Sequence, residues 1–232
     1  MPTFADLDID VPLFAAPIDA AKDFAGTRTC LLCGQRWPCF LLGRDHEVIA
    51  TCDECCRAVP VNARRRSGGC PRCGRTISIR ETLQVVPELL TKVYACAGCL
   101  RAGRWAQTMV TELGVVRWPD GFSPAADQPA LGPARSAFQE LLRTPVYATF
   151  QGENWLVCHD VPMTFLGQWC RTDLDAARPG AGAVLLAEIV EDSQPDVLWE
   201  SGLGESIGTS PAGVYVFRCE RCGRLRAHSD CG

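Results

Sequence analysis

The sequence predicts an α+β protein built in two parts, and three features predict this fold class. Ten of its fifteen cysteines form five Cys-x-x-Cys pairs, four of them between residues 30 and 99. A proline- and glycine-rich stretch follows at 118–133, where proline removes backbone donors and disfavours a helix. The last pair follows a β-branched and aromatic run. We therefore expect a ribbon and knuckle module, then a small mixed domain ending in a β-hairpin with a Cys-x-x-Cys knuckle.

These features divide the chain into four predicted parts. Residues 1–29 form an N-terminal arm, in which residues 19–24 make one or two helical turns. Residues 30–105 form the cysteine-rich module, 106–133 a linker, and 134–232 the C-terminal α+β domain.

Local patterns predict individual elements. Apolar spacing indicates a helix over 98–113, and a second helix over 134–143 ends before Pro145. The apolar run 183–190 is compatible with a helix or a strand. Residues 213–219 form a strand, which a knuckle connects to a return strand.

Composition restricts the class of protein. The chain has 232 residues, 47% hydrophobic and 22% charged, with a net charge of -4. These values exclude wholesale disorder and a generic nucleic-acid coat protein. Residues 1–11 contain three aspartates and no basic residue, the reverse of an export signal, and no run approaches 18 apolar residues. We expect a soluble cytoplasmic protein without a membrane span.

The cysteine pairs predict bound zinc. Zinc in structural sites takes four tetrahedral ligands, and a two-residue gap lets both thiolates of a pair bind one ion. A thioredoxin-type redox site would need one such pair at a helix start, not five. We expect two zinc ions, held by Cys30, Cys33, Cys52, Cys55, Cys70, Cys73, Cys96 and Cys99.

The pairing of these eight ligands has two solutions. Sequential pairing joins the pairs in chain order, whereas nested pairing joins 52/55 to 70/73 and 30/33 to 96/99. The fourteen residues between Cys55 and Cys70 suit a compact ribbon, so nested pairing is favoured. The fifth pair needs partners for a third zinc. Its candidates are Cys219 and Cys222 with Cys158, His159, Cys170, His228 or Cys231.

Several motifs resemble the bacterial CbrC family over most of the chain. They are Pro2-x-Phe4, Cys30-x-x-Cys-Gly34, 96–103, Arg143-Thr-Pro145, Tyr147, Phe150-Gln-Gly152, Trp155, Cys158-His-Asp160, Phe165-Leu-Gly167, 214–223 and Asp230. The chain departs from that family by an inserted ribbon at about 44–85, which carries the pairs 52/55 and 70/73 and supports nested pairing. The family is associated by name with colicin tolerance, so the resemblance implies a role in toxin tolerance without an established chemistry.

The inventory of catalytic motifs predicts that the protein is not an enzyme. It has three histidines, and it lacks a His-Glu-x-x-His motif, a Walker loop and a Gly-x-Ser-x-Gly motif. The Cys158-His159-Asp160 run is a possible nucleophile, but neighbours in sequence rarely face each other, so ligand or core roles are favoured. A catalytic zinc needs an open coordination position, whereas zinc sites made of four thiolates are closed.

Two charged segments suggest different partners. Residues 188–205 carry six acids and no base around Trp199, which suits a basic protein partner such as a nuclease toxin. The candidate contacts are Glu188, Glu191, Asp192, Trp199 and Glu200. Residues 57–80 carry seven arginines and no acid, so nucleic-acid binding through Arg64, Arg65 and Arg66 is the alternative. A purely structural subunit of a larger complex is the third hypothesis.

Overall fold

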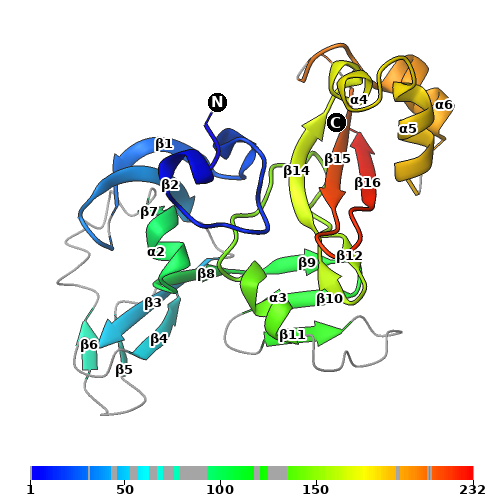
Figure 1. Ribbon diagram of the computed structural model, residues 1–232. Helices are drawn as coiled ribbons and strands as arrows, with labels where there is room; N and C mark the ends of the chain where they lie inside the picture. Colours follow the sequence, from blue (N-terminus) through cyan, green and yellow to red (C-terminus); the bar gives the residue numbers. More distant parts are fainter. Residues whose placement is uncertain are drawn as a thin grey trace.

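The fold is seen in a computed structural model, which combines short sheets with small helices (Figure 1). It describes residues 2–30, 32–42, 46–52, 57–62, 67–69, 76–78, 93–117, 121–124, 135–191, 194–207, 209 and 211–231. Within these residues, no helix is long and apolar enough to cross a membrane.

The N-terminal half is built on a three-stranded antiparallel sheet of order β1-β2-β7. Its elements are the 3-10 turns Ala5–Leu7 and Ile18–Ala20, β1 (Phe24–Thr29), β2 (Arg36–Leu42), β7 (Val93–Cys96) and α2 (Ala97–Arg101). A second sheet has the order β4-β3-β8, and β5 pairs with β6. These strands are β3 (His46–Cys52), β4 (Arg57–Asn62), β5 (Ser67–Gly69), β6 (Thr76–Ser78) and β8 (Trp105–Gln107).

The C-terminal half contains a meander, a small hairpin and a sheet covered by helices. The meander and its neighbours are β9 (Met109–Thr111), β10 (Gly114–Arg117), β11 (Gly121–Pro124), α3 (Arg135–Leu141), β12 (Val157–Cys158) and β13 (Val161–Pro162). The antiparallel sheet β14-β15-β16 consists of Thr164–Trp169, Ala212–Arg218 and Leu225–Cys231. The helical elements that follow β14 are α4 (Arg171–Ala177), α5 (Gly182–Ile189), α6 (Pro195–Val197) and the π-helical turn Leu198–Gly202.

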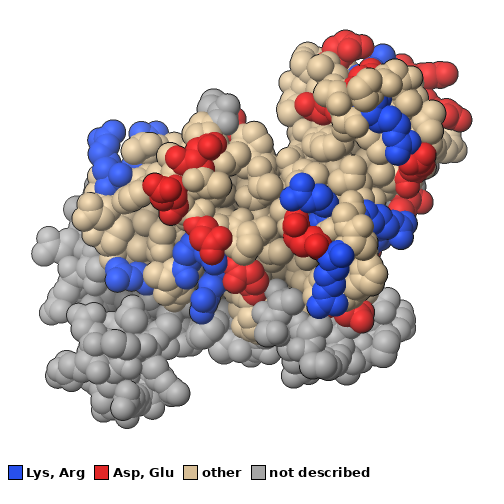
Figure 2. Space-filling view, in the orientation of Figure 1, with Lys and Arg blue, Asp and Glu red and all other residues tan. Residues whose placement is uncertain are grey.

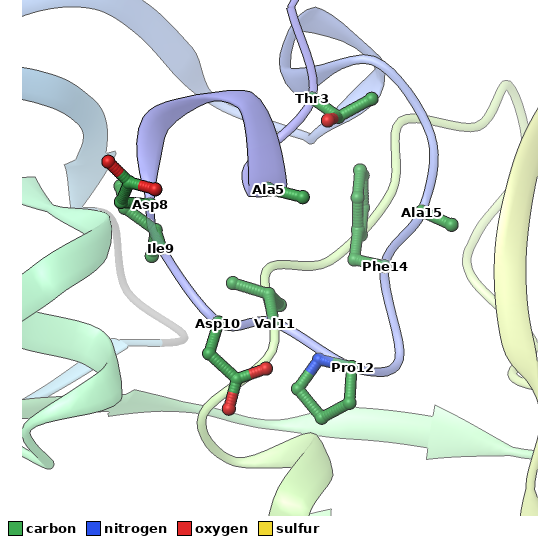
Figure 3. A pocket seen from close by; sticks show the side chains of 9 residues that line it. All are labelled: Thr3, Ala5, Asp8, Ile9, Asp10, Val11, Pro12, Phe14 and Ala15. Atoms are coloured by element: carbon green, nitrogen blue, oxygen red, sulfur yellow. The ribbon is translucent and has the colours of Figure 1, made fainter.

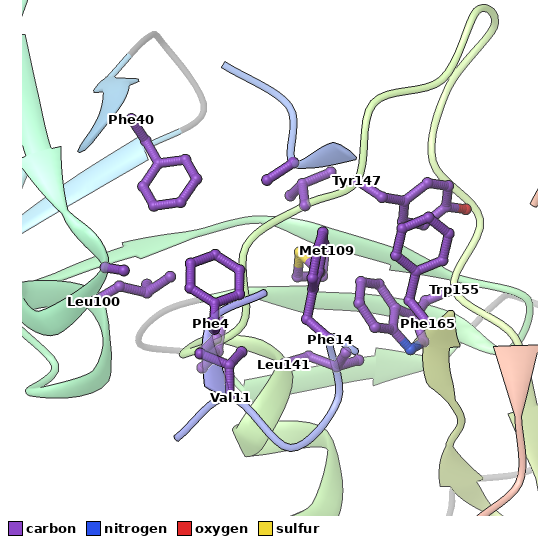
Figure 4. Packing of buried hydrophobic residues seen from close by; sticks show 14 of the residues in the cluster. Phe4, Val11, Phe14, Phe40, Leu100, Met109, Leu141, Tyr147, Trp155 and Phe165 are labelled. Atoms are coloured by element: carbon purple, nitrogen blue, oxygen red, sulfur yellow. The ribbon is translucent and has the colours of Figure 1, made fainter. Parts of the chain in front are cut away.

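An aromatic core joins the two halves (Figure 4). Phe14 packs edge-on against both Phe4 and Phe165, with ring centroids 5.4 and 5.2 Å apart. The ring of Tyr147 stacks on Phe165 at 4.5 Å. Large rings bury much apolar surface, so this cluster dominates the packing energy of the fold. A separate apolar cluster lies between α4–α6 and the β14-β15-β16 sheet.

The structure differs from four expectations about the chain. The predicted arm, 1–29, packs into the aromatic core through Phe4, Phe14 and Ile18. Its expected helical turns are a single 3-10 turn, and Phe24 already begins β1.

The expected helix over 98–113 ends at Arg101. Gly103 has a φ of +67°, which breaks the helix, and the apolar residues beyond it lie on the strands β8 and β9 instead. The predicted linker, 106–133, therefore holds β9, β10 and β11. The helix predicted over 134–143 matches α3, and the ambiguous run 183–190 is α5.

Candidate metal centres

The Cys30 pair forms a tight knuckle between β1 and β2. The N–H of Gly34 donates to the carbonyl of Cys30 at 2.8 Å, and the N–H of Cys30 donates to Gln35 O at 2.8 Å. Gly34 has a φ of +71°, which glycine adopts without the penalty that a side chain would bring. The turn therefore fixes both cysteines of the pair on one side of the chain.

Cys96 and Cys99 meet this knuckle from the end of β7 and the start of α2. The sulfurs of Cys30 and Cys99 are 3.7 Å apart, and those of Cys33 and Cys96 are 3.8 Å apart. Four sulfurs that surround one zinc ion at about 2.3 Å lie about 3.8 Å from each other. All four cysteines are free of disulfides. We call these residues the four-cysteine cluster; its arrangement is the nested one.

Backbone donors and neighbouring thiols favour a thiolate at Cys30 in this cluster. The N–H of Cys96 donates to the sulfur of Cys30 at 3.3 Å, and that of Cys99 donates to Cys96 at 3.4 Å. Hydrogen bonds from Cys39, Cys96 and Cys99 hold the pKa of the Cys30 thiol well below its usual range. Bonding to Cys30 raises the pKa of Cys96 to about 12. Without a cation, one thiolate suppresses the ionisation of its neighbours, so a bound metal ion is needed to ionise all four.

A second group of four donors lies in the C-terminal half of the chain. It comprises Cys158, His159, Cys219 and Cys222, whose donor atoms all lie within 4.8 Å of one another. Cys219 and Cys222 sit in the turn between β15 and β16. This turn repeats the first knuckle, with Gly223 N–H to Cys219 O at 2.8 Å and Cys219 N–H to Arg224 O at 2.9 Å. We call these residues the cysteine–histidine cluster.

The other two donors come from a small hairpin: Cys158 ends β12, and His159 lies in the two-residue loop that follows. His159 and Asp160 join β12 to β13 and have φ values of 53° and 58°, as in a type I′ turn. This turn brings the sulfur of Cys158 to 3.1 Å from His159 Nδ1. The expectation that these neighbours do not face each other is therefore wrong, because left-handed backbone at both loop positions turns the imidazole back over the strand.

The distances in the cysteine–histidine cluster also suit one metal ion. The sulfurs of Cys158 and Cys222 are 3.9 Å apart, and Cys219 is 3.7 Å from His159 Nδ1. Burial raises the pKa of Cys219, but hydrogen bonds from His159 and from the N–H groups of Cys222 and Arg221 outweigh it and lower the pKa to about 6. Burial and bonding to the other thiols raise the pKa of Cys158 to about 11.

Arg226 on β16 supports the hairpin that carries Cys158. Its guanidinium donates to the carboxylate of Glu112 at 2.7 and 2.9 Å and to Val157 O at 2.5 Å. It also pairs with Glu191 after α5. These bonds tie three separate elements together beside the cluster.

The remaining candidate ligands divide into two groups. The side chains of Cys52, Cys55, Cys70 and Cys73 lie outside the described residues. Cys170 bonds Asp173 at 3.0 Å, His228 bonds the Tyr147 hydroxyl at 2.7 Å, and Cys231 is exposed. The structure thus assigns Cys158 and His159, and not these three, to the fifth pair.

The acidic segment is partly neutralised within the chain. Glu188 makes two bonds to Arg178, at 2.8 and 2.7 Å, and Glu191 pairs with Arg224 and Arg226. Trp199 is half-buried, with Arg171 stacked on its ring at 5.3 Å. Figure 2 shows acidic and basic side chains interleaved at the α5–α6 end. Asp192, Arg64, Arg65 and Arg66 lie outside the described residues.

A cavity of about 490 Å³ lies within the loop 3–15 (Figure 3). Its titratable side chains are Asp8 and Asp10, and Asp10 lies 3.8 Å from Arg101. A further cavity of about 290 Å³ adjoins the four-cysteine cluster and is lined by Trp37 and Arg104. Neither adds a general base beside a nucleophile, so they give no positive indication of catalysis.

The chain was compared with known proteins and protein families. The comparison with curated proteins gives no match, and neither does that with solved structures. The model of an uncharacterised protein family, UPF0167, matches residues 59–231, about three quarters of the chain. This range includes Cys96, Cys99 and the whole cysteine–histidine cluster, whereas Cys30 and Cys33 precede it. The chain therefore belongs to the uncharacterised family UPF0167.

Proposed function

We propose that this chain is a non-catalytic, zinc-stabilised cytoplasmic protein that acts by binding another protein. The observation that carries the proposal is the completeness of the two donor clusters. Each supplies four protein ligands, and sites of this kind are closed, whereas catalytic zinc keeps a position for water or substrate. Thiolate with imidazole is a donor set that zinc prefers. In this proposal the bound ions hold the loops around each cluster in a fixed shape, and these loops form part of the protein-binding surface.

A third ion belongs to the inserted zinc ribbon. With Cys30 and Cys33 joined to Cys96 and Cys99, the nested arrangement leaves Cys52, Cys55, Cys70 and Cys73 for one another. The proposal therefore amounts to three zinc ions per chain: two in the clusters and one in the ribbon.

The first test is metal content. Purified protein should carry three zinc ions per chain by inductively coupled plasma mass spectrometry, and Cys70→Ser, Cys158→Ser and Cys231→Ser variants should carry two, two and three. Less than one zinc per chain, or disulfides in place of thiols, would contradict the proposal. Cobalt substitution separates the two kinds of site, because a histidine ligand changes the visible spectrum of a four-sulfur centre.

The proposed partner is a basic protein, such as a nuclease toxin. Support comes from the net charge of -4, from the acidic side chains near α5 and α6, and from the resemblance to the CbrC family, which we take to be the same family as UPF0167. Opposite charge accelerates encounter between proteins.

Co-expression with candidate toxins tests this partner. Rescue of growth by the wild type, lost when Asp196 and Glu200 are changed to lysine, supports the proposal; no rescue with any toxin contradicts it. Binding of nucleic acid that weakens with salt, and is abolished in the Arg64, Arg65 and Arg66 to Ala variant, would instead establish the nucleic-acid alternative.

A further inference from the structure

The N-terminal segment is fastened to the C-terminal half at two points. At the first, Phe14 bridges Phe165, and the N–H of Ala15 donates to Phe165 O at 2.8 Å. At the second, Ala21 bridges Tyr147, and the N–H of Ala148 donates to Ala20 O at 2.8 Å. Between these points the segment makes the turn Ile18–Ala20.

The strand opposite this turn is also irregular. The register of β14 shifts between Phe165 and Gly167, and Gly167 has a φ of +134°. Such a bulge redirects side chains and bends the strand. A cavity of about 390 Å³ lies between the turn and the bulge. The cavity therefore lies where two irregular segments, the turn and the bulge, face each other without forming a regular sheet.

The lining of this cavity has one sign of charge and an aromatic wall. Asp19 and Asp173 are its titratable residues; no lysine, arginine or histidine occurs among the described residues that line it. One carboxylate oxygen of Asp173 accepts bonds from the N–H and the thiol of Cys170, at 2.9 and 3.0 Å. Asp19 is exposed on the turn, and the half-buried Trp169 also lines the cavity. A cation satisfies both kinds of wall, because carboxylates pair with it and an aromatic face attracts it.

We propose that this cavity binds an arginine side chain of a protein partner. A guanidinium is planar, carries five donors and stacks on aromatic rings, so it fits a site with two carboxylates, the Gln168 amide and Trp169 better than an ammonium does. Ile207 lines the same cavity with 58% of its surface exposed, and it offers apolar contact to the residues beside the arginine. The inference rests on the proposed protein-binding function and assigns it a contact outside the segment 188–200.

The test uses the full-length, zinc-loaded protein and the peptide acetyl-Gly-Arg-Gly-amide. Titration followed by ¹H–¹⁵N NMR should shift the Trp169 indole and Gly167 amide signals in a saturable way. The same peptide with citrulline, which keeps the shape and removes the charge, should bind at least tenfold more weakly, and the lysine peptide several-fold more weakly. Asp19→Asn should weaken arginine binding several-fold, whereas Asp8→Asn, which removes an exposed carboxylate outside this cavity, should not.

Two outcomes overturn the inference: equal binding of the arginine and citrulline peptides, or unchanged binding in Asp19→Asn. The outcomes also separate this inference from the proposed function. If a toxin is neutralised equally by the wild type and by Asp19→Asn, the cavity is not the contact although the protein-binding function stands. If the arginine peptide binds as expected but no partner is neutralised, the cavity stands and the proposed partner is wrong.

Discussion

The four-cysteine cluster and the cysteine–histidine cluster begin from the same local structure and complete it in different ways. In both, a Cys-x-x-Cys-Gly knuckle has its glycine at a φ near +70°, and the same two backbone hydrogen bonds close the turn. The remaining ligands of the first cluster come from a strand end and the start of α2. Those of the second come from the end of β12 and the two-residue hairpin loop after it.

Burial separates the two clusters further. In the four-cysteine cluster Cys30, Cys96 and Cys99 are buried and Cys33 is half-buried. In the cysteine–histidine cluster Cys219 is buried, Cys158 is half-buried, and His159 and Cys222 are exposed. A metal ion in the first cluster would therefore stabilise part of the buried core of the N-terminal half. An ion in the second holds two turns together at the surface. The same knuckle therefore contributes either to a buried core or to a local link between two surface turns, depending on the burial of the other ligands.

The largest expected effect is the loss of the buried cluster. Cys96→Ser removes one thiolate and leaves the buried Cys30 and Cys99 and the half-buried Cys33 without their cation. Structural zinc sites contribute roughly 10–16 kcal/mol of apparent binding energy, which exceeds the roughly 5–15 kcal/mol of net stability of a typical protein. We expect no cooperative thermal transition by circular dichroism for this variant.

The matched control for this change is Cys231→Ser, because that cysteine is exposed and belongs to neither cluster. It should melt like the wild type. A Cys96→Ser protein that keeps its melting temperature would show that the four-cysteine cluster does not depend on metal for its fold.

The second expected effect is a difference in the rate of metal release. The exposed ligands of the cysteine–histidine cluster admit a chelator directly, whereas the four-cysteine cluster must open its core first. Release to a chromogenic chelator should therefore be biphasic. The rate constant of the fast phase should be at least ten times that of the slow phase. Cys158→Ser should remove an ion from the fast phase and leave the slow phase unchanged. A single phase for all ions would remove the distinction between the two clusters.

Part of this comparison is visible in the sequence. Five Cys-x-x-Cys pairs, three followed by glycine, predict the knuckles, and the fourteen residues between Cys55 and Cys70 favour the nesting that places Cys30 with Cys96. The spacing works because a knuckle is a local structure of five residues. The final strand over 213–219 and the helix over 134–143 were predictable for the same reason.

The fourth ligand of the second cluster was not singled out, because its signal is weak. His159 was one of several candidates, and a type I′ turn usually has asparagine or glycine where this chain has His159-Asp160. The packing of Phe4 and Phe14 against Phe165 was also missed. No local pattern reports contacts between residues so far apart in sequence, and short apolar runs near Trp105 fit a helix and a strand equally.

A smaller effect should follow from removing the support of one cluster only. Arg226→Gln breaks the bonds to Glu112, Glu191 and Val157 O, the last of which fixes the strand that carries Cys158. We expect a loss of about 1–3 kcal/mol in the free energy of unfolding, because the guanidinium is mostly buried. Metal affinity should fall about tenfold at the cysteine–histidine cluster and stay unchanged at the other. Competition with a fluorescent chelator measures both.

The matched control is Arg178→Gln, because that residue makes an exposed pair with Glu188 far from any cluster residue in sequence. This change should leave the free energy of unfolding almost unchanged, since exposed ion pairs contribute little. Acid offers an independent check. The Arg226 guanidinium lowers the pKa of Glu191, so the stability from this pair is complete above the usual pKa of a glutamate and is lost as the pH falls through the lowered value. In Arg226→Gln this part of the acid dependence should be absent. If Arg226→Gln and Arg178→Gln lost equal metal affinity at the cysteine–histidine cluster, Arg226 would not be the residue that supports this cluster.

The smallest expected effect concerns the glycines of the two knuckles. Gly34→Ala and Gly223→Ala place a side chain on left-handed backbone, with φ values of +71° and +74°. A Cβ atom meets nothing within 4 Å at either position, so backbone strain of about 1 kcal/mol is the whole cost. Because the strain is the same, each change should weaken its own cluster about fivefold in a chelator competition, and Asn variants should lose less because Asn tolerates this backbone. A much larger loss at Gly34 would show that the knuckle of the four-cysteine cluster depends on its surroundings and that the two turns are not equivalent units.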